Sequence, residues 1–505
     1  MVKKIKSLVV RAYFWTVHLL EQWLAVLFSQ EREKQNRWFS RVWLVAVFLG
    51  MIFVWGRFLW WGTVGLNYQD WGQITIPRVN IIREALERGI LPLNVGDPST
   101  LHNMTDRFLS IQDVITTPEM VMLLWVPVNY YIVVEFFIYL IIATLGLLWI
   151  RKHFHLSLIA YSVMYVLFMF NGYIQAHIGE GHFTWGAYFL FPWFIALVVL
   201  LLEGKANWRW LAAISFMFLY MLLVGGEHLY VWLLIFLGFL ALVCFDRIKW
   251  ILGAMVASVF IGAIRLLPPA LIYFELKSRF PFISGFPSLY YLGMSMVTLV
   301  TQNISAWNIS DPLGPWEYDV YVGLIGTAFL FYFGIWQWYK QRQFHPELTC
   351  LALPSLALVI LSIGNIYEYF ERLPIPLLSG ERVSTRLIAV PLTVVIVMSA
   401  IYFQKWLDER KLSNMAMIGA LTLGGVLFYE LKYHAITWNT QALYLGASYH
   451  WTYDRVYLGN HYDPPYITIL IVGLALTVLT ATFLVVMARR EHNKQKRSQV
   501  SQPAL

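Results

Sequence analysis

The sequence predicts an all-α fold, a polytopic bundle of transmembrane helices, and its composition and apolar runs carry that prediction. Of the 505 residues, 59% are hydrophobic and only 13% are charged, whereas about a quarter of a soluble chain is charged. The apolar runs approach the roughly 20 residues that a helix needs to cross the hydrocarbon, and short charged clusters separate them. They do not show the alternating ten-residue strands of an outer-membrane barrel. A water-soluble domain and a membrane barrel are therefore both excluded.

The N-terminal segment, residues 1–41, is predicted to contain a cytoplasmic amphipathic helix that lies in the membrane interface. Its apolar stretch, residues 8–28, includes Arg11, His18 and Glu21 and has cations on both sides. A transmembrane helix would leave one cationic flank on the outer side, whereas an interfacial helix keeps both in the cytoplasm. We therefore expect this helix not to cross the membrane.

About twelve spans are expected in the rest of the chain, which we divide into two transmembrane modules, residues 42–273 and 274–487. A basic cytoplasmic tail, residues 488–505, follows them. The expected spans lie at residues 42–62, 121–150, 156–173, 183–202, 208–225, 229–245, 250–273, 319–339, 348–363, 387–403, 414–430 and 466–487.

The distribution of charge predicts the orientation. Lys and Arg concentrate before the first span, in alternate short connections and after the last span, while most acidic residues fall on the other side. Because cytoplasmic segments of membrane proteins are enriched in Lys and Arg, both termini are predicted to be cytoplasmic. The long loops, about 63–120, 274–318, 364–386 and 431–465, then face outwards, where we expect the functional site. The excess of 37 basic over 29 acidic residues thus reflects topology and indicates no nucleic-acid partner.

One acidic residue, Asp70, follows the first span closely and begins the outer loop 63–120. It stands among tryptophans near the outer interface, where a carboxylate can reach a lipid headgroup. Residues 77–89 predict a short helix on the membrane, because Pro77 stands near its start and Gly89 at its stop. Asp70 is a candidate catalytic residue, although its position alone also fits an ordinary loop carboxylate.

Two short outer turns are expected to place further acids and imidazoles near the outer interface, at the depth of Asp70. The turns read His177-Ile178-Gly179-Glu180-Gly181-His182 and Gly225-Gly226-Glu227-His228. Glycines let the backbone bring such side chains close to a ligand. The first turn offers three potential metal ligands without a fourth, which is a weak indication of a divalent metal, and solvated polar groups or substrate hydrogen bonds are favoured.

Several arginines on the outer side are candidates for binding phosphate. Arg265 stands in an apolar run before Pro268-Pro269, where a charge is costly unless it faces a cavity or a counter-charge. Arg382 and Arg386 are one helical turn apart, so on a helix they share a face and suit a phosphate. Pairing with Glu381 or reaching to the interface are the alternatives for these two.

The order of these features resembles the GT-C class of polytopic glycosyltransferases, and more narrowly its YfhO-type bacterial members. The matching pieces are Asp70, the helix of residues 78–89 running into GILPLN, and the span entries GEGHFTWGAYFLFPW, WEYDVYVGL and LLSGERVSTRLIAVPL. The resemblance implies transfer of a sugar from a polyprenyl-phosphate donor on the outer face, with the first-loop acid as the catalytic residue. Many members carry paired acids in this loop, whereas this chain has Asp70 alone.

With that resemblance the candidate residues receive roles. A lipid-phosphate donor needs cations for the leaving phosphate and a carboxylate that accepts the proton of the attacking hydroxyl. The implied roles are Asp70 as general base, Arg78, Arg265, Arg382 and Arg386 as donor-phosphate contacts, and Glu180, His182, Glu227, His228 and Tyr318 as substrate-binding groups. No cofactor is required. The expected partners are the lipid-linked sugar, an extracytoplasmic acceptor (glycan, lipid or protein) and membrane lipids, in the cell membrane.

Two other classes of protein stay open. A non-catalytic scaffold subunit of a membrane complex would use its aromatic residues for lipid and partner contacts. A secondary transporter would use charges near the midplane, for which Arg265 and Glu135 in the second expected span could serve. A transporter should also show two similarly built halves, and the sequence shows none.

Overall fold

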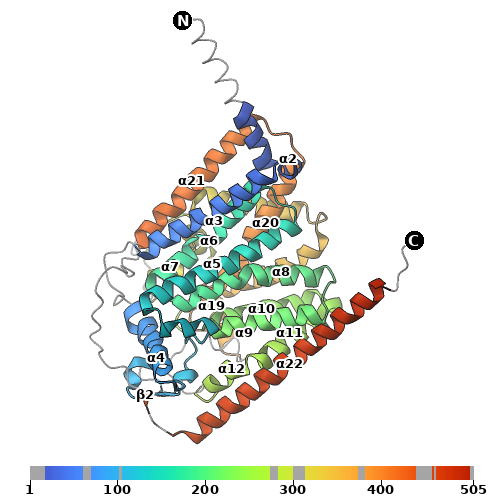
Figure 1. The fold of residues 1–505 in the computed structure, drawn as a ribbon. Coiled ribbons are helices and arrows are strands. Elements are labelled where there is room, and N and C mark those ends of the chain that lie inside the picture. The colour runs from blue at the N-terminus through green and yellow to red at the C-terminus, as the bar shows by residue number, and fades with distance from the viewer. Residues whose placement is uncertain are drawn as a thin grey trace, which may run out of the picture.

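The computed structural model describes residues 18–60, 70–101, 105–272, 282–299, 313–373, 381–438, 458–459 and 462–500. Within these ranges the chain is mostly helical, and strands β1 (Asn94–Val95) and β2 (Leu458–Gly459) form a short antiparallel pair. The predicted all-α class is thus confirmed. Figure 1 shows the bundle with α2 (Gln30–Gln35) at one end and α4 (Ile76–Glu87) and β2 at the opposite end.

Eight helical stretches among the described residues are long and apolar enough to cross a membrane, which supports a multi-pass membrane protein. They are Arg37–Leu59, Val128–His153, Leu158–Glu180, Phe183–Leu202, Pro315–Lys340, Ser384–Asp408, Asn414–Trp438 and Pro464–Lys496. A ninth is counted if the pair Glu227–Val243 and Phe245–Ile261, bent by 116°, is one span. The expected number of about twelve is therefore not confirmed.

Individual helices and turns subdivide these stretches. In the first half of the chain they are α3 (Arg37–Trp60), η1 (Trp71–Thr75), η2 (Pro98–Leu101), η3 (Phe108–Ser110), η4 (Pro118–Leu124), α5 (Val128–His153), α6 (Leu158–Met169), α7 (Gly172–Glu180), η5 (Phe183–Leu190), α8 (Phe191–Leu202), α9 (Trp208–Leu223), α10 (Glu227–Val243), η6 (Phe245–Arg247), α11 (Ile248–Ile261) and α12 (Ala263–Ala270). The second half contains α14 (Leu289–Ser295), η8 (Pro315–Tyr318), α16 (Gly323–Phe329), η9 (Leu330–Gln337), α17 (Trp338–Lys340), η10 (Pro346–Leu351), α18 (Ala352–Leu361), α19 (Gly364–Glu371), η11 (Ser384–Ile388), α20 (Ala389–Asp408), α21 (Asn414–Trp438) and α22 (Pro464–Val500).

The segments expected at 208–225 and 348–363 form helices, but short ones. Asn207 begins α9 by accepting hydrogen bonds from the backbone N–H groups of Arg209 and Trp210 at 2.9 and 3.1 Å, as a helix-capping residue does. Gly225, with a φ of +84°, lies just beyond its end. These 16 residues rise only about 24 Å, which is less than the roughly 30 Å thickness of the hydrocarbon core.

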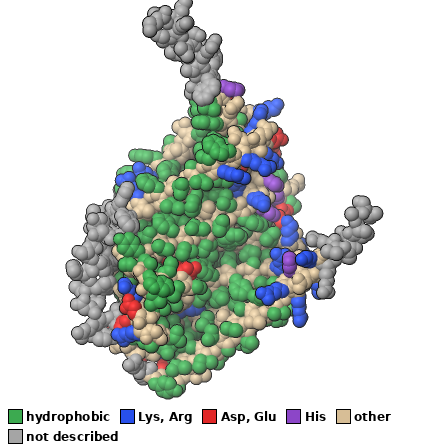
Figure 2. All heavy atoms as spheres, in the orientation of Figure 1, with side chains coloured by type: hydrophobic (Ala, Val, Ile, Leu, Met, Phe, Trp, Pro, Cys, Tyr) green, Lys and Arg blue, Asp and Glu red, His purple; other side chains and the backbone are tan. Residues whose placement is uncertain are grey.

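Burial separates inner helices from outer ones. The most apolar stretch of Ser384–Asp408, which contains α20, is 94% buried, whereas that of Pro464–Lys496, in α22, is 11% buried. Exposed apolar side chains on a helix this long fit contact with lipid. Figure 2 shows hydrophobic side chains covering the middle of the visible face, with most charged groups towards its two ends.

The helix after Asp70 differs from its expected setting. It forms, as α4, but most of one face is buried inside the protein, including Ile76, Arg78 and Ile82. It packs against η4 and α5, so it is a structural part of the bundle's end and does not only lie on the membrane. At the N-terminus, residues 18–28 contain a helix, while residues 1–17 lie outside the described ranges, so its interfacial placement stays a prediction.

Candidate functional site

The candidate site forms where three spans begin with a 3-10 turn. Trp185 lies on η5, Glu317 on η8 and Arg386 on η11. The third expected span is interrupted here, because Asn171 caps α7 by accepting a hydrogen bond from the N–H of Ile174 at 3.4 Å. Its amide also donates to the carbonyl oxygens of Leu167 and Phe168 in the last turn of α6. The chain continues through α7, and His177 and Glu180 lie near the end of that helix.

Asp70 and two histidines form a hydrogen-bonded chain. The Oδ2 atom of Asp70 lies 2.8 Å from Nε2 of His182, and Nδ1 of His182 lies 2.8 Å from Nδ1 of His177. The side chain of Asp70 is 27% exposed, that of His182 is 12% exposed, and His177 is fully buried. Each imidazole nitrogen donates or accepts according to tautomer. The chain therefore links a solvent-accessible carboxylate to a buried imidazole and can orient Asp70.

Gly181 holds the segment of Asp70 against the end of α7. It has a φ of +110°, and a Cβ atom there would lie 2.2 Å from the backbone nitrogen of Trp71. The indole of Trp71 donates to the carbonyl of Ile178 at 3.1 Å, and the hydroxyl of Thr75 donates to the carbonyl of Gly181 at 2.7 Å. Only glycine allows this conformation together with this close approach.

A second polar chain runs through buried carboxylates. Arg386 donates from Nε to Oε2 of Glu317 at 2.8 Å, and its Nη2 donates to the other oxygen. Its Nη1 lies 3.8 Å from Glu381, which also accepts a hydrogen bond from the indole of Trp232 at 2.7 Å and lies 3.1 Å from Nδ1 of His228. Burial alone would raise the pKa of Glu381, but His228 and Arg386 hold it below its ordinary value.

Trp185 joins the two chains. Its ring centroid lies 4.8 Å from that of His177, 5.1 Å from His182 and 5.9 Å from His228. The guanidinium carbon of Arg386 stands 5.0 Å from the same ring, a distance at which cation and ring attract each other. The five groups therefore form one cluster.

Arg382 stands beside this cluster, within electrostatic range of Arg386, Glu381 and Glu317. Burial, together with the neighbouring positive charge of Arg386, lowers the pKa of Arg382. A cation held near another cation is stabilised by an anion. A phosphate contact by Arg382 therefore stays a prediction.

The other two predicted phosphate contacts are already paired. Nη1 of Arg78 lies 2.5 Å from Oδ1 of Asp113, and the Arg78 side chain is almost fully buried while Asp113 is 38% exposed. Burial acts to raise the pKa of Asp113, but the charge and hydrogen bond of Arg78 hold it below its ordinary value. Arg265 is buried as well and pairs with Glu227 at 3.0 Å.

Arg265 also fastens the first outer loop. Its Nη2 donates to the carbonyl oxygens of Ile111 and Gln112 at 3.1 and 2.7 Å. We expected Glu227 among the substrate-binding groups. In the structure it is the counter-charge that offsets the energetic cost of burying Arg265. The burial of Arg265 and Glu227 is therefore explained by a structural role, which is to hold the loop that carries Asp113.

The remaining predicted residues, Glu180 and Tyr318, are both buried. Glu180 is 5% exposed at the end of α7, adjacent to Gly181 and so to the Asp70 segment. Tyr318 is fully buried and packs edge-to-face against Phe286, with ring centroids 5.8 Å apart. The half-exposed Trp316, two residues earlier, lies with its ring centroid 6.3 Å from that of His182. Substrate contacts by Glu180 and Tyr318 stay predictions.

Within the described ranges, no group of three or more His, Cys, Asp or Glu side chains is arranged to hold a metal ion. His177 and His182 bond to each other, and Glu180 does not complete a ligand set with them. No metal role is assigned to this turn.

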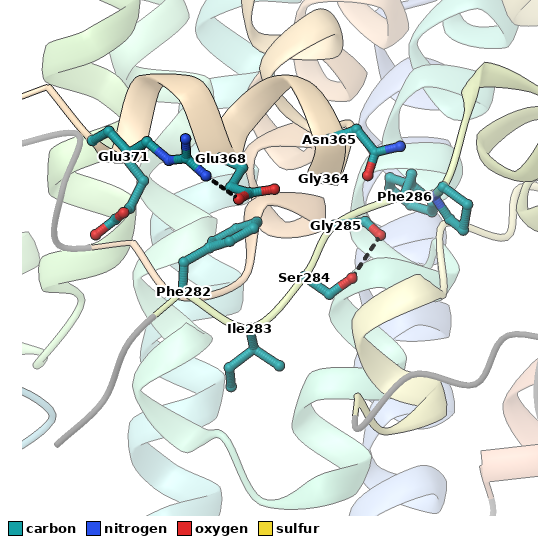
Figure 3. A pocket seen from close by; sticks show the side chains of 11 residues that line it. Phe282, Ile283, Ser284, Gly285, Phe286, Gly364, Asn365, Glu368 and Glu371 are labelled. Atoms are coloured by element: carbon teal, nitrogen blue, oxygen red, sulfur yellow. Dashed lines mark hydrogen bonds and ion pairs between the residues drawn. The ribbon is translucent and has the colours of Figure 1, made fainter.

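A pocket of about 560 Å³ lies behind the strand-like segment 282–287 and α19. Figure 3 shows Phe282, Asn365 and Glu368 among the residues around it. The same segment runs beside the site, because the N–H of Ile283 donates to the carbonyl of Arg382 at 2.8 Å. The pocket and Arg382 are therefore separated by one backbone segment.

Sequence reasoning missed Trp185 and Glu317 as residues of the site, and Asp113 as the partner of Arg78. Trp185 and Glu317 stand inside the quoted motifs GEGHFTWGAYFLFPW and WEYDVYVGL, so position in a motif was the available signal. Asp113 has no motif around it. Its role depends on a contact with Arg78 across 35 residues, which no local pattern indicates.

Comparisons with family models, curated proteins and solved structures find no match to this chain. The fold and composition define a multi-pass helical membrane protein, and its function has to be argued from the cluster itself.

Proposed function

We propose that this protein is a GT-C-like, YfhO-type membrane glycosyltransferase that transfers a sugar from a polyprenyl-phosphate donor to an extracytoplasmic acceptor. The observation that carries the proposal is the juxtaposition of Asp70, paired with His182, and Arg386 on η11, joined through Trp185. A carboxylate near cations is the arrangement that deprotonation of an acceptor and departure of a phosphate require.

Asp70 is the general base in this proposal. His182 engages its Oδ2 atom at 2.8 Å and so fixes the orientation of the carboxylate. The partial exposure of Asp70 lets a hydroxyl group of the acceptor approach. As that hydroxyl attacks the anomeric carbon of the donor, the carboxylate accepts its proton, the bond from sugar to phosphate breaks, and the lipid phosphate departs.

Arg382 is the cation that we assign to the departing phosphate. Arg386 is divided between Glu317 and Glu381, so it contributes less net charge and instead positions η11. The electrostatic setting of Arg382 supports this assignment, because an anion beside it would offset the repulsion from Arg386. Arg78 and Arg265 act indirectly, since they hold the loop of Asp113.

The pocket lined by Phe282, Asn365 and Glu368 is the space that we assign to the acceptor. Its volume of about 560 Å³ lies in the range of small-ligand sites, roughly 300–1,000 Å³. An aromatic ring with carboxylate and amide groups suits the hydroxyl groups and apolar faces of a sugar. We propose that the site faces away from the cytoplasm and that both termini are cytoplasmic, in line with the distribution of Lys and Arg.

The central test is the variant Asp70→Asn in a radiolabelled sugar-transfer assay with purified membranes over a titration of polyprenyl-phosphate sugars. The amide keeps the shape and a hydrogen bond to His182 but cannot accept a proton, so turnover should fall by about 10²- to 10⁴-fold. The matched control is Glu87→Gln, an exposed acid of α4 that pairs only with Arg83, which should keep wild-type turnover. Near-normal turnover of Asp70→Asn would remove Asp70 as the base.

The scaffold alternative is favoured by one observation. Glu317, Arg386, Glu381 and His228 satisfy one another without any ligand, as a purely structural network would. A wild-type protein that consumes no lipid-linked sugar, while Arg386→Met still disrupts its fold, would support the scaffold function.

A further inference from the structure

A buried polar cluster lies between α5 and the start of η4. It is separate from the residues that we assign to sugar transfer. Glu135 is fully buried, and its Oε1 atom accepts hydrogen bonds from Thr117 at 3.1 Å and from the hydroxyl of Tyr139 at 2.7 Å. Glu119, on η4, accepts a hydrogen bond through Oε1 from the hydroxyl of Tyr220 at 3.2 Å. We call Thr117, Glu119, Tyr131 and Glu135 the α5 cluster.

Three buried oxygen atoms of this cluster have no partner. They are Oε2 of Glu135, Oε2 of Glu119 and the hydroxyl of Tyr131. Buried polar atoms in proteins are nearly always hydrogen-bonded, and an exception commonly marks the position of a water molecule or an ion. Such exceptions in one cluster suit a ligand that contacts several oxygen atoms at once.

The charges of the cluster are also uncompensated. The two carboxylates lie within electrostatic range of each other and of Tyr131. Among the described residues, neither carboxylate forms an ion pair with a Lys, Arg or His. A buried carboxylate beside a partly buried one is costly to keep ionised without a counter-charge. A shared proton would compensate one charge but would still leave carboxylate and hydroxyl oxygens unpaired.

We propose that Glu119 and Glu135, with the hydroxyl groups of Thr117 and Tyr131, bind a divalent cation through oxygen ligands. Carboxylates, hydroxyls and water are the ligands that Ca²⁺ and Mg²⁺ prefer, and two carboxylates neutralise a divalent charge. The ion would join η4 to α5, close to the point where the N–H of Thr116 donates to the carbonyl of Leu223 at the end of α9 at 2.6 Å. It would thus hold the end of the loop whose other part is fastened by Arg265. This inference does not depend on the proposed transfer reaction.

Terbium luminescence tests the site directly. Tb³⁺ replaces Ca²⁺ at oxygen sites, and the rings of Tyr131 and Tyr139 are close enough to transfer excitation to it. The purified full-length protein in detergent should give saturable Tb³⁺ emission that Ca²⁺ displaces. Glu135→Gln and the separately made Glu119→Gln should each weaken binding by about tenfold or more, and Glu87→Gln should leave it unchanged.

Thermal unfolding provides the second measurement. Ca²⁺ should raise the Tm of the wild type above its value in EDTA, because a ligand that binds only the folded state stabilises it. It should not raise the Tm of Glu135→Gln. If Ca²⁺ and Mg²⁺ leave the wild-type Tm unchanged, or if Tb³⁺ emission is the same in wild type and Glu135→Gln, the proposal is wrong. Should Glu135→Gln fail to fold, Glu119→Gln, whose side chain is only partly buried, decides the question.

Discussion

Arg386 makes a two-point ion pair with Glu317, although 69 residues separate them in the sequence. The pair connects the entrances of two spans, η8 and η11, and the ring of Trp185 lies against the same guanidinium group. The cluster thus depends on a contact that fastens three spans to one another.

Breaking this pair should be costly. In Arg386→Met, Glu317 keeps its charge in a buried position, and removal of one partner of a buried pair typically destabilises a protein by about 3–5 kcal/mol. The double variant Arg386→Met with Glu317→Leu should regain part of that loss, because no unpaired charge remains. Thermal unfolding in detergent measures both. A double variant that is no more stable than the single one would contradict the view that the unpaired carboxylate is the cause.

Gly181→Ala should disturb the Asp70 segment without changing any charged group. At a φ of +110° a non-glycine residue costs about 1–3 kcal/mol, and the added Cβ would press on the backbone of Trp71. We expect a lower Tm and a loss of transfer activity. Gly238→Ala is the matched control, since a Cβ at Gly238, inside α10, meets nothing within 4 Å. Equal behaviour of the two variants would show that the close approach at Gly181 is unimportant.

The Arg78–Asp113 pair should give stability that depends on pH. The pKa of Asp113 in the folded protein is below the ordinary value of 3.8, so the pair's contribution is fully present above that value. It is lost as the pH falls through the folded-state pKa. Asp113→Asn lacks the contribution at every pH, so the Tm difference from wild type should be constant near neutrality and shrink below about pH 4. A difference that grows on acidification would contradict this assignment.

Labelling of single cysteines should reveal the orientation. In a background with Cys244 and Cys350 replaced by serine, Leu91→Cys, at an exposed position after α4, should react with a membrane-impermeant maleimide added outside. Glu409→Cys, at the end of α20 and also exposed, should react only after permeabilisation. The opposite pattern would place the cluster on the cytoplasmic side and remove the proposed function. The loops around 307 and 450, also expected outside, lie beyond the described residues.

The sequence predicted helices well because helix formation in a membrane depends on local composition. The stretches expected at 183–202 and 414–430 correspond to Phe183–Leu202 and Asn414–Trp438. The number of membrane crossings is harder to predict from the sequence. A 116° bend between α10 and α11, for example, leaves the composition of both helices unchanged. Whether two short apolar helices are one span or two depends on packing, which periodicity does not record.

In the candidate site too, the sequence predicted single residues but not the tertiary contacts between them. Asp70 and Arg386 were predicted from their positions next to expected spans, and Glu381 was considered only as a pairing partner of Arg382 and Arg386. Their partners were not found, because the contacts of Asp70 with His182 and of Arg386 with Glu317 are tertiary. The costly buried charge of Arg265 did indicate that a counter-charge was needed. The sequence could not say that Glu227 supplies it.

The length of α22 has a mechanical consequence. Its 37 residues extend about 55 Å, whereas the hydrocarbon core is roughly 30 Å thick, so an upright helix would project several turns beyond it. Figure 1 shows its C-terminal end running past the neighbouring helices, and that end carries Arg489, Arg490, Lys494 and Lys496. Anionic headgroups would attract these cations and make the helix lean. Because α22 packs along α9, α11 and α12, the lipid charge of one leaflet would then influence the tilt of the whole bundle.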